Sequence, residues 1–199
     1  MKIVVVGATG TIGKAVVNAL QDRHEIVKVG KKGGDLQVDI TDTDSIRALF
    51  KKAGRFDALV STAGKVHFGE LDKMTEKEFA VGLKDKLMGQ VNLVLIGRDH
   101  MNDGGSFTLT AGVLSHDPIR YGASASLVNG ALESFGRAAA IEMPRGIRIN
   151  VVSPGVLVES LPVFGEYFRG HEPVPGARVA NAYLKSVEGR MTGQVLTVL

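Results

Sequence analysis

Three glycines close to the beginning of the chain have the spacing of a phosphate-binding loop. Gly7, Gly10 and Gly13 follow an apolar run at residues 3–6, and an amphipathic run at residues 15–20 comes directly afterwards. In a strand–turn–helix unit, the first glycine permits a tight turn, the second lets the backbone approach a pyrophosphate, and the third lets the helix pack against the strand. Free N–H groups at the helix start attract phosphate. The pattern predicts a dinucleotide-binding loop; a glycine-rich turn without a ligand is the alternative.

Strand and helix patterns alternate along the whole chain. Short runs rich in β-branched residues predict seven strands, at residues 3–6, 26–29, 36–40, 57–61, 106–110, 147–152 and 194–198. Thr41 caps one helix, Thr75 opens a long helix over residues 76–102, and a further helix covers residues 121–142. This alternation predicts an α/β fold: a Rossmann-like, doubly wound parallel sheet in a three-layer α/β/α arrangement.

The least regular part of the chain is residues 156–175. It contains prolines, glycines and three aromatic residues: Phe164, Tyr167 and Phe168. A segment of this kind, after the carboxyl end of a strand, is where a substrate lid would lie. An ordinary surface connection with one short helix is the alternative.

Length and composition indicate a single globular domain, residues 1–199. Hydrophobic residues make up 44% of the chain and charged residues 23%, which suits a sizeable core. The absence of cysteine excludes disulfides and thiolate metal sites. The apolar run at residues 3–6 is too short for a signal peptide and no stretch reaches membrane-spanning length, so we expect a cytoplasmic protein without membrane contacts.

Neither the charge pattern nor the histidines indicate a nucleic-acid or metal site. The net charge is +3, but lysine and arginine are scattered and aromatic residues make up only 6%. We therefore expect a solvated surface with a few cations for an anionic cofactor, and no nucleic-acid partner. The five histidines are dispersed, without metal-ligand spacing, and no metal site is predicted.

Four motifs, in this order and spacing, resemble those of the short-chain dehydrogenase/reductase family over nearly the full chain. They are the loop at residues 7–13, Asp39 within residues 38–42, residues 61–64 (Ser-Thr-Ala-Gly) and residues 148–155, which end in Pro-Gly. The resemblance implies that Asp39 lies beside the adenine ring and that the Pro-Gly turn flanks the nicotinamide. It implies these cofactor-binding residues: Gly7, Thr9, Gly10, Thr11, Ile12, Gly13, Asp39, Ile40, Ser61, Ala63, Gly64, Pro154 and Gly155.

The residues after the second predicted strand favour NADP(H) over NAD(H). An acidic side chain at this strand end would bind the ribose 2′-hydroxyl and disfavour a 2′-phosphate. The sequence at residues 28–32 has no carboxylate and ends in Lys31 and Lys32. Either lysine could neutralise a 2′-phosphate, and both could instead be solvated loop charges.

The resemblance also identifies candidate catalytic residues, and here the chain departs from the family pattern. Family members use Asn, Ser, Tyr and Lys, with the lysine four residues after the tyrosine. Tyr121 occupies the tyrosine position, but Ala125 stands in place of the lysine. Thr110 is the best hydroxyl candidate for the serine, and Lys86 lies at about the position of the asparagine. The chain is thus similar to a small, atypical family member.

Lys86 could supply the positive charge that the missing lysine would give. An ammonium beside the nicotinamide would lower the pKa of Tyr121 by stabilising its phenolate. The alternatives are that Lys86 is a solvated helix charge, that Tyr121 packs or contacts a ligand without transferring a proton, and that Thr110 serves the structure of its strand end.

The resemblance implies an oxidoreductase that transfers hydride between NADP(H) and a small carbonyl or alcohol substrate. Because the lysine is missing, a catalytically impaired NADP(H)-binding sensor or scaffold is the alternative. Family members usually assemble through the helices predicted at residues 76–102 and 121–142, so we expect a homodimer or homotetramer.

Overall fold

Seven parallel strands form one sheet at the centre of the molecule. The computed structural model describes all 199 residues. The sheet order is β3-β2-β1-β4-β5-β6-β7, and every neighbouring pair is parallel. The strands are β1 (Lys2–Val6), β2 (Glu25–Gly30), β3 (Leu36–Gln37), β4 (Phe56–Ser61), β5 (Met101–Thr110), β6 (Arg148–Pro154) and β7 (Val195–Val198). The predicted doubly wound parallel sheet is confirmed.

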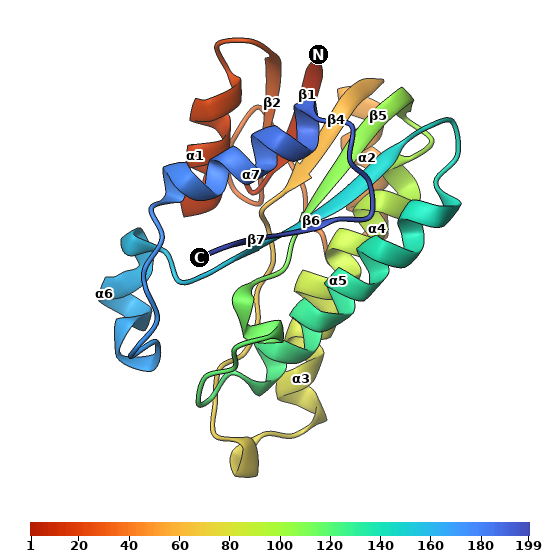
Figure 1. Cartoon of the computed structure of the whole chain (residues 1–199). Helices are drawn as coiled ribbons and strands as arrows, with labels where there is room; N and C mark the ends of the chain where they lie inside the picture. The colour runs from red at the N-terminus through yellow and green to blue at the C-terminus, as the bar shows by residue number, and fades with distance from the viewer.

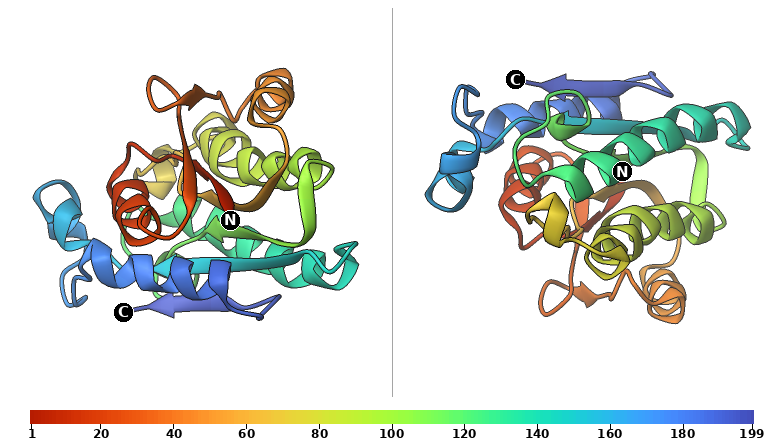
Figure 2. Two further views of the ribbon diagram at one scale, coloured as in Figure 1. Left: turned by 90° about the horizontal axis from the view of Figure 1, so that it is seen from above. Right: turned by 90° about the horizontal axis from the view of Figure 1, so that it is seen from below.

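Helices cover both faces of the sheet (Figure 1). One face carries α1 (Thr11–Leu20) and α7 (Gly176–Glu188), and the other carries α2 (Thr43–Ala53), α4 (Met88–Gly97) and α5 (Ala123–Glu142). The short α3 (Glu76–Gly82) and α6 (Leu161–Phe164) lie beyond the carboxyl ends of the strands (Figures 1 and 2). The sequence did not lead us to expect α7, which follows the irregular segment.

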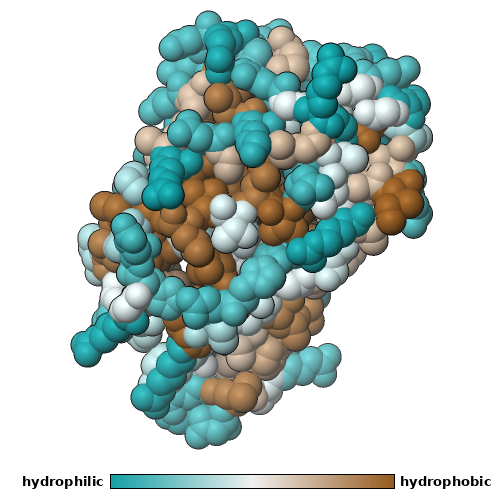
Figure 3. Space-filling model, in the orientation of Figure 1, coloured by the Kyte–Doolittle hydropathy of each residue, from teal (hydrophilic) through white to brown (hydrophobic).

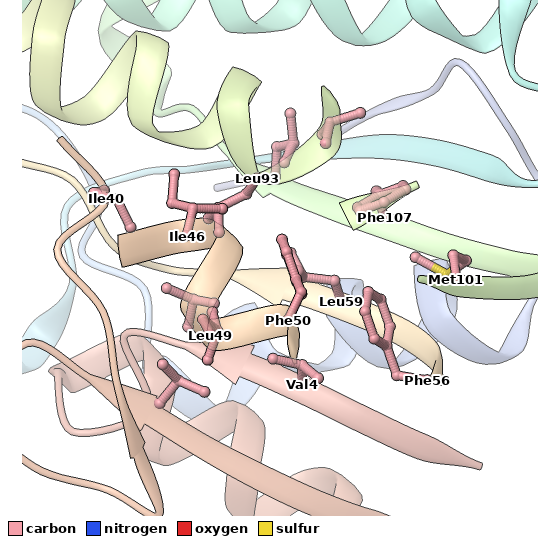
Figure 4. Close-up of a cluster of buried hydrophobic side chains, with 14 of the residues drawn as sticks. Val4, Ile40, Ile46, Leu49, Phe50, Phe56, Leu59, Leu93, Met101 and Phe107 are labelled. Atoms are coloured by element: carbon pink, nitrogen blue, oxygen red, sulfur yellow. The ribbon is translucent and has the colours of Figure 1, made fainter. Parts of the chain in front are cut away.

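Two apolar layers hold the helices on the sheet. On the α2–α4–α5 side, Phe50, Phe56 and Phe107 are fully buried, and the rings of Phe50 and Phe56 stack with centroids 5.5 Å apart (Figure 4). Under α1 and α7 the largest buried side chain is Tyr183. The two apolar layers hold the sheet between the helices. The loops at the carboxyl edge of the sheet are therefore anchored on a packed core.

The capping predictions are correct at one helix and shifted at another. Thr75 caps α3 in a complete capping box with Glu78, as predicted. Asp42, not Thr41, caps α2: its carboxylate accepts from the Asp44 N–H, whereas the Thr41 hydroxyl donates to Asp39.

The long helix predicted at residues 76–102 is found, but it ends earlier than predicted, at Gly97. It is helical without a break from Glu76, and a π-helical turn at Leu83–Leu87, here called the π-turn, joins α3 to α4. Met101 already belongs to β5, because it pairs with Phe56 of β4 and its side chain is fully buried. A π-turn inside a helix often marks a functional position.

The segment at residues 156–175 consists of short helical turns whose two ends are bonded to each other. The Val158 N–H donates to the Val174 carbonyl at 3.0 Å, and Leu157 bridges to Val174. Between these ends lie α6 and two single turns, Val158–Ser160 and Gly165–Tyr167. No helix of the structure is long and apolar enough to cross a membrane.

The contact of α5 with the sheet gives a first testable prediction. A Cβ added to Gly136 would lie 2.5 Å from Val151 Cγ2 of β6, so Gly136→Ala forces the helix away from the strand. We expect this substitution to lower the free energy of unfolding by about 1–3 kcal/mol, the usual cost of overpacking. Ser134→Ala, at an exposed position of the same helix, should change it by less than about 0.5 kcal/mol. Urea denaturation measures both, and equal values for the two variants would contradict the packing described.

Candidate functional site

The glycine loop after β1 is folded closely against its surroundings. Gly7 has φ +87°, and a Cβ there would lie 2.8 Å from the Ala63 backbone nitrogen. A Cβ on Gly13 would overlap the carbonyl oxygen of Gly7. The two glycines are therefore required by the turn and by the approach of α1 to it.

The first turn of α1 leaves its N–H groups free. Its N-cap is Gly10, which has no side chain to accept a hydrogen bond, and the first turn holds no acidic residue. A cavity of about 270 Å³ opens beside this turn. Predicted cofactor-binding residues line it: Gly7, Thr9, Gly10, Lys31, Asp39, Ile40, Ala63 and Gly64. Unpaired N–H groups in a glycine cradle suit the pyrophosphate of a dinucleotide, so the residues present fit that group.

Lys31 and Asp39 form an ion pair at the rim of this first cavity. Their charged atoms are 2.8 Å apart, and both side chains are partly exposed. The hydrogen bond from Lys31, with further ones from Thr41, lowers the pKa of Asp39 to about 2. Lys32 is exposed and does not line the cavity.

A second cavity, of about 240 Å³, lies at the carboxyl ends of β4, β5 and β6. It shares Thr62, Ala63 and Gly64 with the first, so the two meet along the loop after β4. Three residues predicted to bind the cofactor line it: Ile12, Pro154 and Gly155. Thr11 and Ser61 line neither cavity: Thr11 borders a cleft between α1 and α7, and Ser61 is fully buried in β4.

Lys86 directs its ammonium group into the second cavity. The group donates hydrogen bonds to the Ala111 carbonyl at 2.8 Å and to Asn129 Oδ1 at 2.7 Å. Its stem packs against Gly64, where a Cβ would lie 2.7 Å from Lys86 Cγ. Burial without a carboxylate partner lowers the pKa of Lys86 to about 8. These two hydrogen bonds favour a role at the cavity over that of a solvated helix charge.

Asn129 is the site residue that sequence reasoning missed. It is buried on α5, lines the second cavity, and orients the Lys86 ammonium through its side-chain carbonyl. It lies four residues after Ala125, which also lines the cavity, so the two share one helix face. That spacing from Ala125 is the signal that could have identified it.

Thr110 lies at the second cavity, but its hydroxyl is used within the fold. It donates to the Ser61 carbonyl at 2.5 Å and accepts from the Tyr183 hydroxyl at 2.6 Å. Burial raises the pKa of that tyrosine. Gln90 bonds both the N–H and the carbonyl of Thr110, each at 2.9 Å. These contacts support the structural interpretation of Thr110.

Tyr121 lies outside α5 and lines a different cavity. Its φ of +69° is unusual for an aromatic residue and separates it from the helix, which begins at Ala123. Its ring meets Tyr167 edge-on at 5.9 Å, and the Arg120 guanidinium lies 4.7 Å from its centroid. The predicted pairing of Tyr121 with Lys86 is not found: Lys86 lines the second cavity, and Tyr121 lines a neighbouring cavity that Lys86 does not reach.

A buried carboxylate connects the elements around the second cavity. Glu133 of α5 accepts hydrogen bonds from Ser115 at 2.6 Å and from Ser153 at 3.0 Å, and its other oxygen lies 2.7 Å from His116 Nε2. Ser153 directly precedes Pro154. Glu133 thus joins the β5–α5 connection to the carboxyl end of β6. No group of three or more His, Asp or Glu residues could hold a metal ion.

Comparison with known proteins identifies the relationship. A family model described as enoyl-(acyl carrier protein) reductase matches residues 3–172. The chain belongs to the short-chain dehydrogenase/reductase family. Proteins of this family are oxidoreductases that bind a nicotinamide cofactor.

Individual relatives agree with this assignment. The solved structure of protein lin1944 from Listeria innocua is 49% identical, covers all of both chains and has a TM-score of 0.99. A small-chain dehydrogenase in complex with NADPH is 26% identical over the whole chain and 96% of its own, with a TM-score of 0.88. Short-chain dehydrogenase/reductase GME11373 from Pestalotiopsis microspora is 32% identical over 144 residues, 69% of this chain. The match spans 54% of that relative, about half its length.

The lowered pKa of Lys86 predicts a pH-dependent stability. The folded state holds this lysine with a pKa of about 8, against 10.5 ordinarily, so its cost to folding is present below pH 8 and disappears as the pH rises toward 10.5. Over this range the unfolding free energy of the wild type should rise by about 3 kcal/mol relative to Lys86→Met. Urea denaturation at several pH values measures the difference. A difference that does not vary with pH would show that the ammonium is solvated.

Proposed function

We propose that the chain is an NADP(H)-dependent oxidoreductase that transfers hydride between the cofactor and a small carbonyl or alcohol substrate. The observation that carries the proposal is the meeting of two cavities along residues 62–64. One cavity ends at the free N–H groups of α1 and the other at the Lys86 ammonium. The related NADPH complex supports the choice of cofactor class.

Residues of the two cavities would hold opposite halves of the dinucleotide. The α1 N-terminus and the glycine loop would bind the pyrophosphate, and Asp39 and Ile40 would border the adenine. Pro154 and Gly155 would flank the nicotinamide. When bound, the cofactor would supply or accept the hydride.

Lys86 has the properties that carbonyl reduction requires of a proton donor. An ammonium with a pKa of about 8 is protonated at neutral pH and can release its proton more readily than an ordinary lysine. Its charge would also stabilise negative charge developing on the substrate oxygen. The Ala111 carbonyl and Asn129 hold the group in place, and neither carries an opposing charge.

Lys86→Met tests this role most directly. We expect kcat for NADPH-dependent carbonyl reduction to fall about 100-fold or more, because the proton donor is lost. In the wild type, the reduction rate should fall as the pH rises through about 8, and this inflection should persist in Tyr121→Phe. The measurement is NADPH oxidation across a panel of aldehydes, ketones and quinones. Lys84→Met, at an exposed position two residues away, is the matched control.

Unchanged kinetics in Lys86→Met would remove the lysine from the mechanism. NADPH binding without oxidation by any of the panel would favour the alternative, a sensor or scaffold. That alternative further requires NADP⁺ and NADPH to bind with different affinities, because only differential binding shifts an equilibrium.

Cofactor preference gives a separate prediction. Lys31 and Lys32 are the cations available to a 2′-phosphate, and the exposed pair of Lys31 with Asp39 costs little to open. Lys31→Ala combined with Lys32→Ala should weaken NADPH binding by about tenfold and leave NADH binding within about twofold. Calorimetric titration measures both, with Lys51→Ala of α2 as the control. Equal losses for the two cofactors would contradict recognition of the 2′-phosphate.

The homodimer or homotetramer and the cytoplasmic location stay predictions. Exposed apolar side chains on the outer helices support assembly: Val81, Met88, Leu95 and Leu127.

A further inference from the structure

A third cavity, of about 500 Å³, lies beside the second cavity and is lined mainly by aromatic rings. The second cavity holds the Lys86 ammonium and is called the Lys86 cavity below. Its four rings are those of Phe68, Tyr121, Phe164 and Tyr167, and we call it the aromatic cavity. They come from three segments: the loop after β4, the residue pair before α5, and the irregular segment that follows β6. Apolar side chains gather around a hollow near α6 on the face shown in Figure 3.

These rings do not serve the core. None of the four belongs to a buried apolar cluster, and Phe68 and Tyr167 are 37% and 41% exposed. They nevertheless form ordered pairs: Phe68 and Phe164 have centroids 5.7 Å apart, and Tyr121 meets Tyr167 edge-on at 5.9 Å. A ligand that covered these ring faces would remove their exposed apolar surface from water, which favours binding.

The backbone of Tyr121 is held in a costly conformation that keeps its ring at this cavity. A left-handed φ of +69° is sterically unfavourable for an aromatic residue. The Gly69 N–H, itself at the cavity, donates to the Tyr121 carbonyl at 3.1 Å, and Arg120 lies over the ring. These contacts stabilise the position of the Tyr121 ring at the cavity. If α5 began two residues earlier and included Tyr121, the ring would lose this position.

The charges around the aromatic cavity favour a neutral ligand. Glu70 is the one charged residue that lines it, and Lys73 pairs with Glu70 at 2.7 Å. No cation is among the lining residues, and Lys73 and Arg120 are engaged with Glu70 and with the Tyr121 ring. A carboxylate or phosphate would therefore have no lining cation to pair with. The hydroxyl groups of Tyr121 and Tyr167 leave a few polar contacts in an otherwise apolar site, the usual character of a small-molecule pocket.

Phe68 joins the aromatic cavity to the Lys86 cavity, because it lines both. We propose that the aromatic cavity binds the planar aromatic part of a neutral carbonyl substrate, whose carbonyl group extends past Phe68 to the Lys86 ammonium. The reduction of the carbonyl group rests on the proposed function. The binding of the aromatic group rests on the aromatic cavity alone.

The reaction balances with NADPH as the reductant. The carbonyl carbon of the substrate gains the hydride, the π electron pair of the C=O bond moves to oxygen, and that oxygen takes a proton from Lys86. The products are the arylmethanol, or secondary alcohol, and NADP⁺. Lys86 regains its proton from solvent.

Paired aldehydes test the substrate class. 2-Naphthaldehyde and cyclohexanecarbaldehyde carry the same reacting group on a planar aromatic and a puckered saturated ring. We expect kcat/KM with NADPH to be about tenfold higher for 2-naphthaldehyde. Phe164→Ala and Tyr167→Ala should each lower it roughly three- to tenfold, mainly through KM, since an aromatic contact contributes about 0.5–1.5 kcal/mol. Arg169→Ala, exposed in the same segment, is the control.

A binding measurement separates this inference from the proposed function. The chain has no Trp and three Tyr, of which Tyr121 and Tyr167 line the aromatic cavity and Tyr183 is in the core. 2-Naphthalenemethanol should therefore quench tyrosine fluorescence and release heat on titration, and both affinities should fall in Phe164→Ala.

Two results are decisive. If the alcohol binds in a Phe164-dependent way but no carbonyl is reduced, the aromatic cavity is assigned correctly and the proposed function fails. If carbonyls are reduced without preference for 2-naphthaldehyde, or Phe164→Ala and Tyr167→Ala match the control, the inference is overturned and the proposed function stands.

Discussion

The reversal of strand order between β1 and β4 is the constraint on which the rest of the structure depends. From this point the sheet is built outward in both directions, β2 and β3 on one side and β5, β6 and β7 on the other. The chain therefore leaves β1 and β4 in opposite directions along the sheet. A crevice remains between the two connections. The glycine loop fills one wall of that space and residues 62–64 the other, which is why the first and second cavities meet there.

At this site, we propose that the position of the family's cation has been exchanged. The family places a lysine one turn after the tyrosine, on the helix that is α5 here, and this chain has Ala125 at that position. Its ammonium comes instead from the π-turn before α4, across the cavity from α5. Asn129, on the same face of α5 as Ala125, accepts a hydrogen bond from that ammonium. Under the proposed function, the charge would be retained near the nicotinamide end although a different helix supplies it.

Sequence reasoning predicted what depends on local pattern and missed what depends on tertiary placement. The glycine loop, the Thr75 capping box and the parallel sheet follow from spacing and periodicity, and all were found. The end of α4 was misplaced because Met101 is fixed by pairing with Phe56, a contact with a distant strand. Asn129 and Glu133 carry no motif, since their roles come from partners on other elements. The left-handed backbone of Tyr121 likewise has no signature in a helix-like sequence.

The central claim is that a poorly solvated lysine on the π-turn provides the charge of the active site. The most direct measurement is an NMR titration of the protein with isotope-labelled lysine side chains. The account predicts one lysine resonance with a midpoint near pH 8, absent from Lys86→Met and perturbed by NADP⁺. Titration of every lysine near its ordinary pKa of 10.5, unaffected by NADP⁺, would contradict it.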